Sequence, residues 1–208
     1  MILNDNEIRK RVTDYQLMGM DHPLISPFSE SQLQGASYDV TIDKEVIRII
    51  RTNELVDLKE QSAIDRTYER HIIGEDGFIL MPHSSTLVTL KETFFIPPNL
   101  TAHIRPKTRF VRLGLFVSGQ HINPDSICKL NICIYNMTDN PFRIYESMSI
   151  AQIVFEEMID IPSKDKLYKS KRDSHYSNDI DFVGATFSDE YAALIDDEVR
   201  RLLGKTEE

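Results

Sequence analysis

Short runs of alternating polar and apolar residues, closed by proline, glycine or asparagine, recur along most of this chain. In residues 37–42, Ser, Asp and Thr alternate with Tyr, Val and Ile, which is the period of a half-buried β-strand. Further strand-like runs cover residues 46–50, 78–83, 86–90, 130–136 and 148–155. Between them the chain lacks the regular helical segments of an α/β sheet. The pattern therefore predicts a mainly β protein with a barrel or jelly-roll-like architecture.

Helical patterns are expected only at the two ends. Asn4 and Asp5 can cap a short N-terminal helix that carries Ile8 and Val12. Residues 52–70 are polar, and we expect a loop or a short helix there. Ser188 begins a segment with acidic residues in its first turn and apolar residues at helical spacing, which predicts a C-terminal helix over residues 188–208 that packs on the body or on a neighbouring subunit.

Composition narrows the class of protein. A chain of 208 residues that is 41% hydrophobic can bury a core of its own, so we expect one domain. The net charge of −9 argues against nucleic-acid binding, which needs a broad basic surface. The chain shows neither a signal-peptide pattern nor an apolar run of the roughly 18 residues that span a bilayer. We therefore expect no contact with a membrane and a cytoplasmic protein.

The two cysteines are not placed to form a disulfide with each other. Cys128 and Cys133 lie five apart in one expected strand, so their side chains point to opposite faces and cannot bridge each other. No Cys/His spacing typical of a structural zinc site accompanies them. The sequence therefore predicts neither a disulfide nor a metal site.

A basic cluster stands out against this acidic background. The segment from Arg105 to Arg112 also contains Lys107 and Arg109, so four cations crowd into eight residues. Like charges this close repel unless an anion faces them. A solvated basic turn is the alternative interpretation of the same residues.

Five sequence motifs occur in an order that resembles the dCTP deaminases and their trimeric dUTPase relatives. The motifs are Leu33-Gln34-Gly35-Ala36-Ser37-Tyr38-Asp39-Val40, Arg112-Leu113-Gly114-Leu115, Ile122-Asn123-Pro124, a strand that ends in Asn136, and Ala151-Gln152-Ile153. The tail, with Tyr168, Arg172, His175, Tyr176 and Gly184, is similar to that family's C-terminal nucleotide flap. The resemblance covers roughly residues 1–188 and implies a dUTPase-like distorted β-barrel.

The resemblance also implies an organisation and a binding site. Residues 1–161 are expected to form the β domain, residues 162–187 a flap-like segment and residues 188–208 a helical extension. Residues 162–181 are polar, which suits a flap that orders over a ligand and equally suits disorder. Relatives are homotrimers, so the nucleotide pocket is expected between subunits. Its expected ligand-binding residues are Lys107, Thr108, Arg109, Arg112, Asn123, Gln152, Tyr168, Arg172, His175 and Tyr176.

The turn keeps part of the family pattern. Arg112 matches the active-site arginine, Thr108 keeps a hydroxyl where the family holds the attacking water, and Lys107 keeps a cation in place of an arginine. Pro106 replaces a glycine and removes a backbone donor.

The proton-accepting positions depart from the pattern. The deaminases place a glutamate three residues before the strand-ending asparagine as general acid and base, and Cys133 stands there. The dUTPases use an aspartate where this chain has Asn123, and an amide has no useful basicity. Asp125, two residues on, is the least implausible substitute carboxylate if the strand continues, because it would share a face with Asn123. Glu146 and a flap aspartate of another subunit are further options.

Three functions follow from these observations. The first is a catalytically impaired member of the family that binds a pyrimidine nucleotide or a related phosphorylated ligand as a sensor, sponge or regulator. The second is a working dCTP deaminase or dUTPase that uses a substitute carboxylate. The third is a trimeric platform whose C-terminal helix binds a protein partner. The resemblance implies no cofactor for deamination and leaves Mg²⁺ open as a companion of nucleotide phosphates.

Overall fold

The computed structural model describes residues 1–170, 181–182 and 184–187. Its helices are α1 (Asp5–Thr13), α2 (Gln61–Asp65) and α3 (Thr108–Val111), with 3₁₀ turns η1 (Glu30–Gln32), η2 (Lys164–Lys166) and η3 (Tyr168–Ser170). Its strands are β1 (Ile25–Ser26), β2 (Leu33–Gln34), β3 (Ser37–Ile49), β4 (Tyr68–Ile72), β5 (Phe78–Leu80), β6 (Ser85–Ile96), β7 (Leu100–Pro106), β8 (Leu115–Val117), β9 (Gln120–Ile122), β10 (Ser126–Asn136), β11 (Phe142–Ile144) and β12 (Ser149–Glu157).

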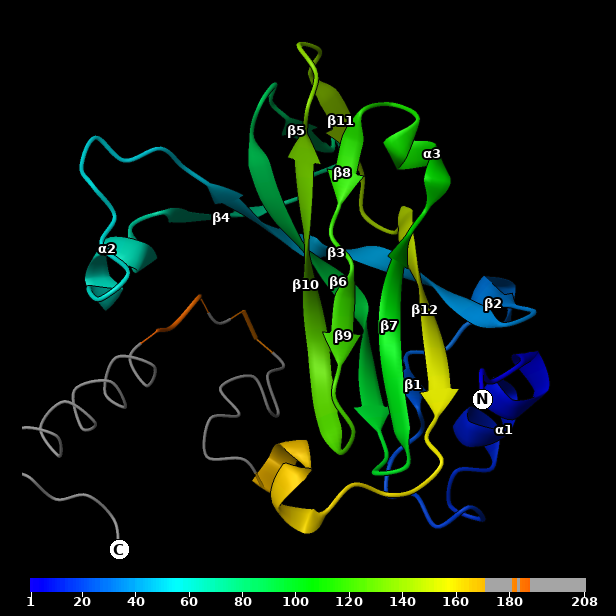
Figure 1. Ribbon diagram of the computed structural model, residues 1–208. Helices are drawn as coiled ribbons and strands as arrows, with labels where there is room; N and C mark the ends of the chain where they lie inside the picture. The colour runs from blue at the N-terminus through cyan, green and yellow to red at the C-terminus, as the bar shows by residue number, and fades with distance from the viewer. Residues whose placement is uncertain (171–180, 183, 188–208) are drawn as a thin grey trace, which may run out of the picture.

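A curled antiparallel sheet dominates the described part of the chain (Figure 1). Its strands follow the order β8-β10-β6-β3-β12-β7-β9, with β1 on β6 and both β2 and β4 on β3, while β5 and β11 form a separate pair. This mainly β, half-barrel architecture confirms the expected fold class. The predicted C-terminal helix, and with it the proposed partner surface, lies outside the described residues.

Strand β3 joins the two layers of the sheet. Its first half pairs with β2 and β12, and its second half pairs with β4 and β6. The pairing with β6 shifts register between Ile42 and Val46, and such a bulge bends a strand. The sequence predicted that residues 46–50 continue the strand pattern of residues 37–42, and the structure joins them in one strand across the molecule.

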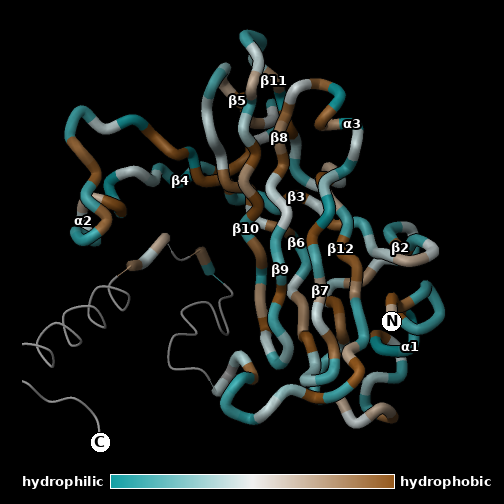
Figure 2. The backbone as a smooth tube through the Cα atoms, viewed as in Figure 1, coloured by the Kyte–Doolittle hydropathy of each residue, from teal (hydrophilic) through white to brown (hydrophobic). Residues whose placement is uncertain are grey.

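Apolar side chains fill the inside of the curl. Along β7, β10 and β12, hydrophobic stretches alternate with hydrophilic ones (Figure 2). The Phe94 and Phe155 rings lie 6.5 Å apart between facing strands, and both side chains are fully buried. Each such side chain contributes roughly 1.5–3 kcal/mol by leaving water. The core therefore holds the strand ends, and the loops that follow them, in fixed positions.

One carboxylate is buried beside this core. Glu92 on β6 is 2% exposed and accepts hydrogen bonds from Thr41 N at 3.0 Å, Thr41 Oγ1 at 2.8 Å and Gln32 Nε2 at 2.8 Å. Gln32 also donates to the Asp39 carbonyl at 2.8 Å. Glu92 thus ties β6 to β3 and to the turn before β2.

The N-terminal helix forms as its sequence predicts. Asn4 caps α1 by accepting from Glu7 N at 3.0 Å, and Ile8 is fully buried beneath the helix. The polar stretch over residues 52–70 contains the expected short helix, α2, and also the start of β4, which was not expected. We call residues 51–72, which project from the sheet in Figure 1, the α2–β4 arm. No helix in the described ranges is long and apolar enough to cross a bilayer.

Candidate functional site

The basic turn sits where β7 ends. Pro106 lacks a backbone donor and closes the strand, and α3 follows with Phe110 buried beneath it at 4% exposure. Gly114 completes the turn at φ +74°, and a Cβ there would lie 2.6 Å from Thr138 Cγ2, so only glycine fits. These constraints leave Thr108, Arg109 and Arg112 exposed on the outside of the turn.

Some cations of the turn have partners within the chain, and others have no ion pair among the described residues. Lys107 Nζ lies 2.6 Å from Asp39 Oδ2, and Arg109 donates to the Ser149 carbonyl. Arg105 and Arg112 make no ion pair with any acid of the described chain, and both are exposed. An incoming anion would therefore meet Arg105 and Arg112 first, and it would have to compete with Asp39 for Lys107.

Gln152 lies beside this turn, as expected for a residue of the same site. In the strand register it stands opposite both Asp39 and Arg105, so the three side chains share one face of the sheet. Its Oε1 accepts from Ser37 Oγ at 3.2 Å. The structure therefore brings Lys107, Arg105 and Gln152 together around Asp39, which the pattern of the turn alone could not indicate.

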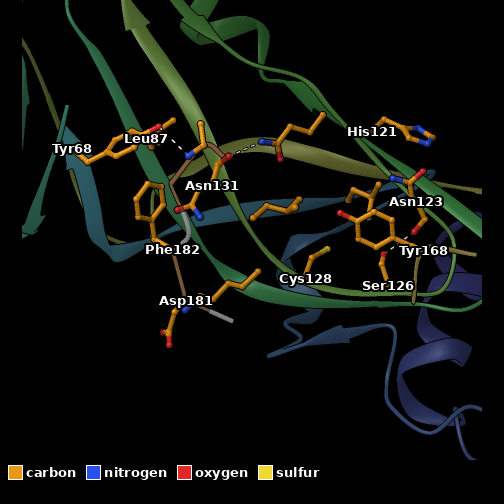
Figure 3. Close-up of a pocket in the computed structure, with 15 residues that line it drawn as sticks. Tyr68, Leu87, His121, Asn123, Ser126, Cys128, Asn131, Tyr168, Asp181 and Phe182 are labelled. Carbon is orange, nitrogen blue, oxygen red and sulfur yellow. Dashed lines mark hydrogen bonds between the residues drawn. The ribbon is translucent and has the colours of Figure 1, made fainter. Parts of the chain in front are cut away.

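A separate cavity of about 430 Å³ lies along β9 and β10 (Figure 3). Its lining residues are Tyr68, Leu87, Gln120, His121, Ile122, Asn123, Ser126, Cys128, Lys129, Leu130, Asn131, Tyr168, Asp181, Phe182 and Ala185. In Figure 3, Tyr68 and Phe182 stand at one end, Asn123 and Tyr168 stand at the other, and Cys128 lies between them. Two of the expected site residues, Asn123 and Tyr168, thus belong to this cavity.

Polar groups of the cavity floor are held in place. Gln120 Nε2 donates to the Asn131 carbonyl at 2.7 Å, and Thr89 Oγ1 donates to Asn131 Oδ1 at 2.8 Å. Lys129 is paired with Asp43 at 2.5 Å. Aromatic walls with fixed amides between them suit a planar ligand that carries hydrogen-bonding groups.

Within one chain, Arg112 at the end of the turn lies far from Asn123 in the cavity. Arg112 precedes β8 and Asn123 follows β9, and the two strands follow one another along the sheet (Figure 1). At about 3.3 Å per residue, the extended run between them spans on the order of 25 Å. Arg105, however, follows Ile104, which stands opposite the cavity residue Gln120 in the register of β7 and β9, so this part of the turn adjoins the cavity in the same subunit.

Comparison with known proteins gives the family. The dCTP deaminase-like family model matches residues 2–158, which is most of the chain. The chain belongs to the dCTP deaminase-like family. It is 31% identical over 179 residues to "dCTP deaminase, dUMP-forming" of Methanothermobacter thermautotrophicus, covering 84% of this chain and 88% of that protein. A protein of the same description from Sulfurihydrogenibium sp. is 30% identical over 172 residues, covering 82% and 91%.

Solved structures agree on the fold. The 2'-deoxycytidine 5'-triphosphate deaminase of Agrobacterium tumefaciens aligns with a TM-score of 0.59 and 19% identity. The alignment covers 81% of this chain and spans half the length of the Agrobacterium chain. At this identity the likeness shows the fold alone.

Cys133 stands at the position where the sequence resemblance implied a glutamate. Cys133 is partly buried on β10, and its N–H donates to Ser118 Oγ at 3.0 Å. Burial raises the pKa of the Cys133 thiol, although a hydrogen bond with Ser85 opposes the shift. Burial likewise raises the pKa of Cys128 to about 12. Both thiols are free, and both stay protonated at neutral pH.

Asp125 does not share a face with Asn123, so the expectation from strand geometry is wrong. Strand β9 ends at Ile122, and Asp125 adopts φ +57° in the turn before β10. Asp125 lines a shallow cleft with His22 and Phe95, whereas Asn123 lines the β9–β10 cavity. The Asp125 side chain is therefore not among the residues that line the β9–β10 cavity.

Sequence reasoning missed His121, a titratable group beside Asn123. His121 lines the cavity, and its ring lies 4.9 Å from the His103 ring, which in turn lies 3.8 Å from Glu156. Burial and the neighbouring His103 lower the pKa of His121, although a hydrogen bond with Asn123 opposes the shift. No group of three or more His, Cys, Asp or Glu side chains placed to hold a metal ion occurs among the described residues. Arg172, His175 and Tyr176 lie outside the described residues.

Proposed function

We propose that this protein binds a deoxypyrimidine nucleotide, or a related phosphorylated ligand, in a pocket shared between subunits of a homotrimer. The observation that carries the proposal is that the chain presents two complementary half-sites. The turn with Arg105 and Arg112 offers unpaired cations, and the β9–β10 cavity offers aromatic walls and amides. A nucleotide carries both a charged and a planar part, so it suits the pair of half-sites when they come from neighbouring subunits.

We further propose that catalysis is impaired. Deamination and diphosphate release both need a group that takes a proton from water. The two positions where the family resemblance expects that group hold a thiol with a raised pKa, Cys133, and an amide, Asn123. Losing a general base typically costs about 10²- to 10⁴-fold in rate.

Binding is tested by calorimetry with dCTP, dUTP, dCMP and dUMP. We expect at least one of them to bind, and we expect Arg112→Ala to weaken it by at least roughly ten-fold, since a hydrogen bond to a charged group contributes about 1.5–3 kcal/mol. Arg51→Ala, which changes an exposed arginine outside both half-sites, is the matched control. Sedimentation of the same samples tests the trimer. The absence of binding by all four nucleotides would refute the proposal.

A second candidate is a working enzyme, and the relatives favour it because proteins that are 30–31% identical bear the name "dCTP deaminase, dUMP-forming". The described cavity supplies Asp181 and the neutral imidazole of His121 as substitute groups. Assays for released ammonia and diphosphate at micromolar protein decide between the two candidates. Turnover at ordinary enzyme rates, abolished by His121→Asn or Asp181→Asn, would establish the second.

A further inference from the structure

A short C-terminal segment is docked on the α2–β4 arm of its own chain. We call the described residues 181–182 and 184–187 the strap. Arg70 on β4 donates from Nη2 to the Phe182 carbonyl at 3.0 Å, and its guanidinium lies 5.3 Å from the centre of the Phe182 ring. The Tyr68 ring meets the same phenyl edge-on at 5.3 Å. Phe182 is therefore held both through its backbone and through its side chain.

The next residues of the strap fit the arm equally closely. Ala185 N donates to the Tyr68 hydroxyl at 3.2 Å, and the Ala185 carbonyl accepts from Gln61 Nε2 at 3.0 Å, so both backbone groups of this residue have partners on the arm. A Cβ at Gly184 would lie 2.9 Å from Tyr68 Cε2. The strap backbone thus lies directly on the tyrosine ring, and a larger residue at position 184 would force the ring or the strap to move.

An ion pair within the same chain orients Arg70 toward the strap. Glu45 on β3 holds Arg70 Nη1 at 3.1 Å, which leaves Nη2 pointing at the Phe182 carbonyl. An arginine oriented in advance by a carboxylate loses less rotamer freedom when it makes its next hydrogen bond.

The docked strap forms a wall of the cavity. Asp181, Phe182 and Ala185 line it together with Tyr68. In Figure 3, Tyr68, Asp181 and Phe182 lie on the side away from Asn123. We infer that Arg70 and Tyr68 are positioning residues for ligand binding, because they hold the strap as a wall of the cavity in the subunit that also supplies the cavity floor. The role in ligand binding rests on the proposed function, whereas the closure of the cavity does not.

The alkylation rate of Cys128 measures how well the strap closes the cavity, and the measurement needs no ligand. It is 7% exposed and lines the cavity, whereas Cys133 on the same strand is not among the lining residues. We measure the alkylation rate of each cysteine separately, by mass spectrometry of the peptides, in the full-length protein. Arg70→Ala and Gly184→Val should each raise the rate at Cys128 by roughly ten-fold and leave Cys133 within about two-fold, since removing contacts of this kind shifts a local equilibrium by factors of about 5–30.

Arg66→Ala is the matched control, because Arg66 lies on the same arm and pairs only with the exposed Glu54, 3.5 Å away. It should leave both rates unchanged, and Arg70→Lys should partly restore slow alkylation because it keeps a cationic donor. An unchanged rate at Cys128 in both Arg70→Ala and Gly184→Val overturns the inference. So does an equal rise at both cysteines, because that result means general loosening of the sheet.

A second experiment measures the binding of dCTP and dUTP. If either binds, Arg70→Ala should weaken it by several-fold, mainly through faster dissociation, whereas Arg66→Ala should not. Unchanged affinity and dissociation rate in Arg70→Ala would refute the positioning role. If neither nucleotide binds the wild-type protein, the proposed function fails, and the alkylation rates still decide whether the strap closes the cavity.

Discussion

Replacing Glu92 by glutamine should destabilise the protein far more than the loss of one charge at the surface would. The carboxylate accepts three hydrogen bonds at 2.8–3.0 Å, from Thr41 N, Thr41 Oγ1 and Gln32 Nε2. Glutamine keeps one acceptor oxygen and turns an NH₂ group toward the remaining donors. At least one buried donor then lacks an acceptor, which costs about 1–3 kcal/mol.

Thermal unfolding at fixed protein concentration measures the effect. For a chain of this size, about 1 kcal/mol corresponds to roughly 2–4 °C in Tm, so we expect Glu92→Gln to lower Tm by about 4–8 °C for a loss near 2 kcal/mol. Glu54→Gln is the matched control, because Glu54 is 79% exposed and pairs loosely with Arg66. Such surface changes usually stay within about 0.5 kcal/mol.

A chain of contacts connects this carboxylate to the basic turn. Gln32 also donates to the Asp39 carbonyl, and Asp39 holds Lys107. A Tm for Glu92→Gln within 1 °C of the wild-type value would refute the argument that the buried carboxylate fastens β6 to β3.

Three further predictions concern the turn and the cavity. Gly114→Ala should lower stability by roughly 1–3 kcal/mol, measured by urea unfolding, because φ +74° and the 2.6 Å approach to Thr138 exclude a Cβ; a neutral result would contradict the geometry. Asp39→Asn should tighten nucleotide binding several-fold and steepen its salt dependence, because it releases Lys107; weaker binding would show that Asp39 orders the site instead. Because the pKa of His121 is lowered from 6.5, the unfolded chain takes up its proton first, so this contribution to stability is present above about pH 6.5 and is lost as the pH falls below it. His121→Asn should therefore make the urea midpoint fall less between pH 7.5 and pH 5.5, and an unchanged fall would count against the shift.

The fold class followed from the sequence because alternation over short runs leaves few alternatives. Residues 37–42 and 130–136 lie in strands, and Asn4 caps α1. Local pattern indicated that residues 46–50 continue this strand, but it could not reveal the bulge near Ile42, which depends on the pairing with β6. Nor could it reveal β4, whose polar sequence is acceptable in an edge strand.

The site was harder to predict because its contacts join distant residues. The turn at Lys107 was found from its charge, but its partner Asp39 lies 68 positions away. Asp125 was misplaced because strand alternation was extended into a turn with positive φ. Tyr68 and Phe182 carry no local signal for the cavity, since their contact depends on how the chain returns to the arm.

Strand β3 sets the spacing between the basic turn and the α2–β4 arm. Asp39, near its beginning, meets Lys107, and Arg48 and Ile49, at its end, pair with Glu69 and Tyr68 of the arm. Inserting one residue anywhere between these points would turn the later side chains to the opposite face, unless the bulge between Ile42 and Val46 absorbs it. The length of this strand is therefore fixed by both ends at once, and the bulge is the one place where it can vary without separating them.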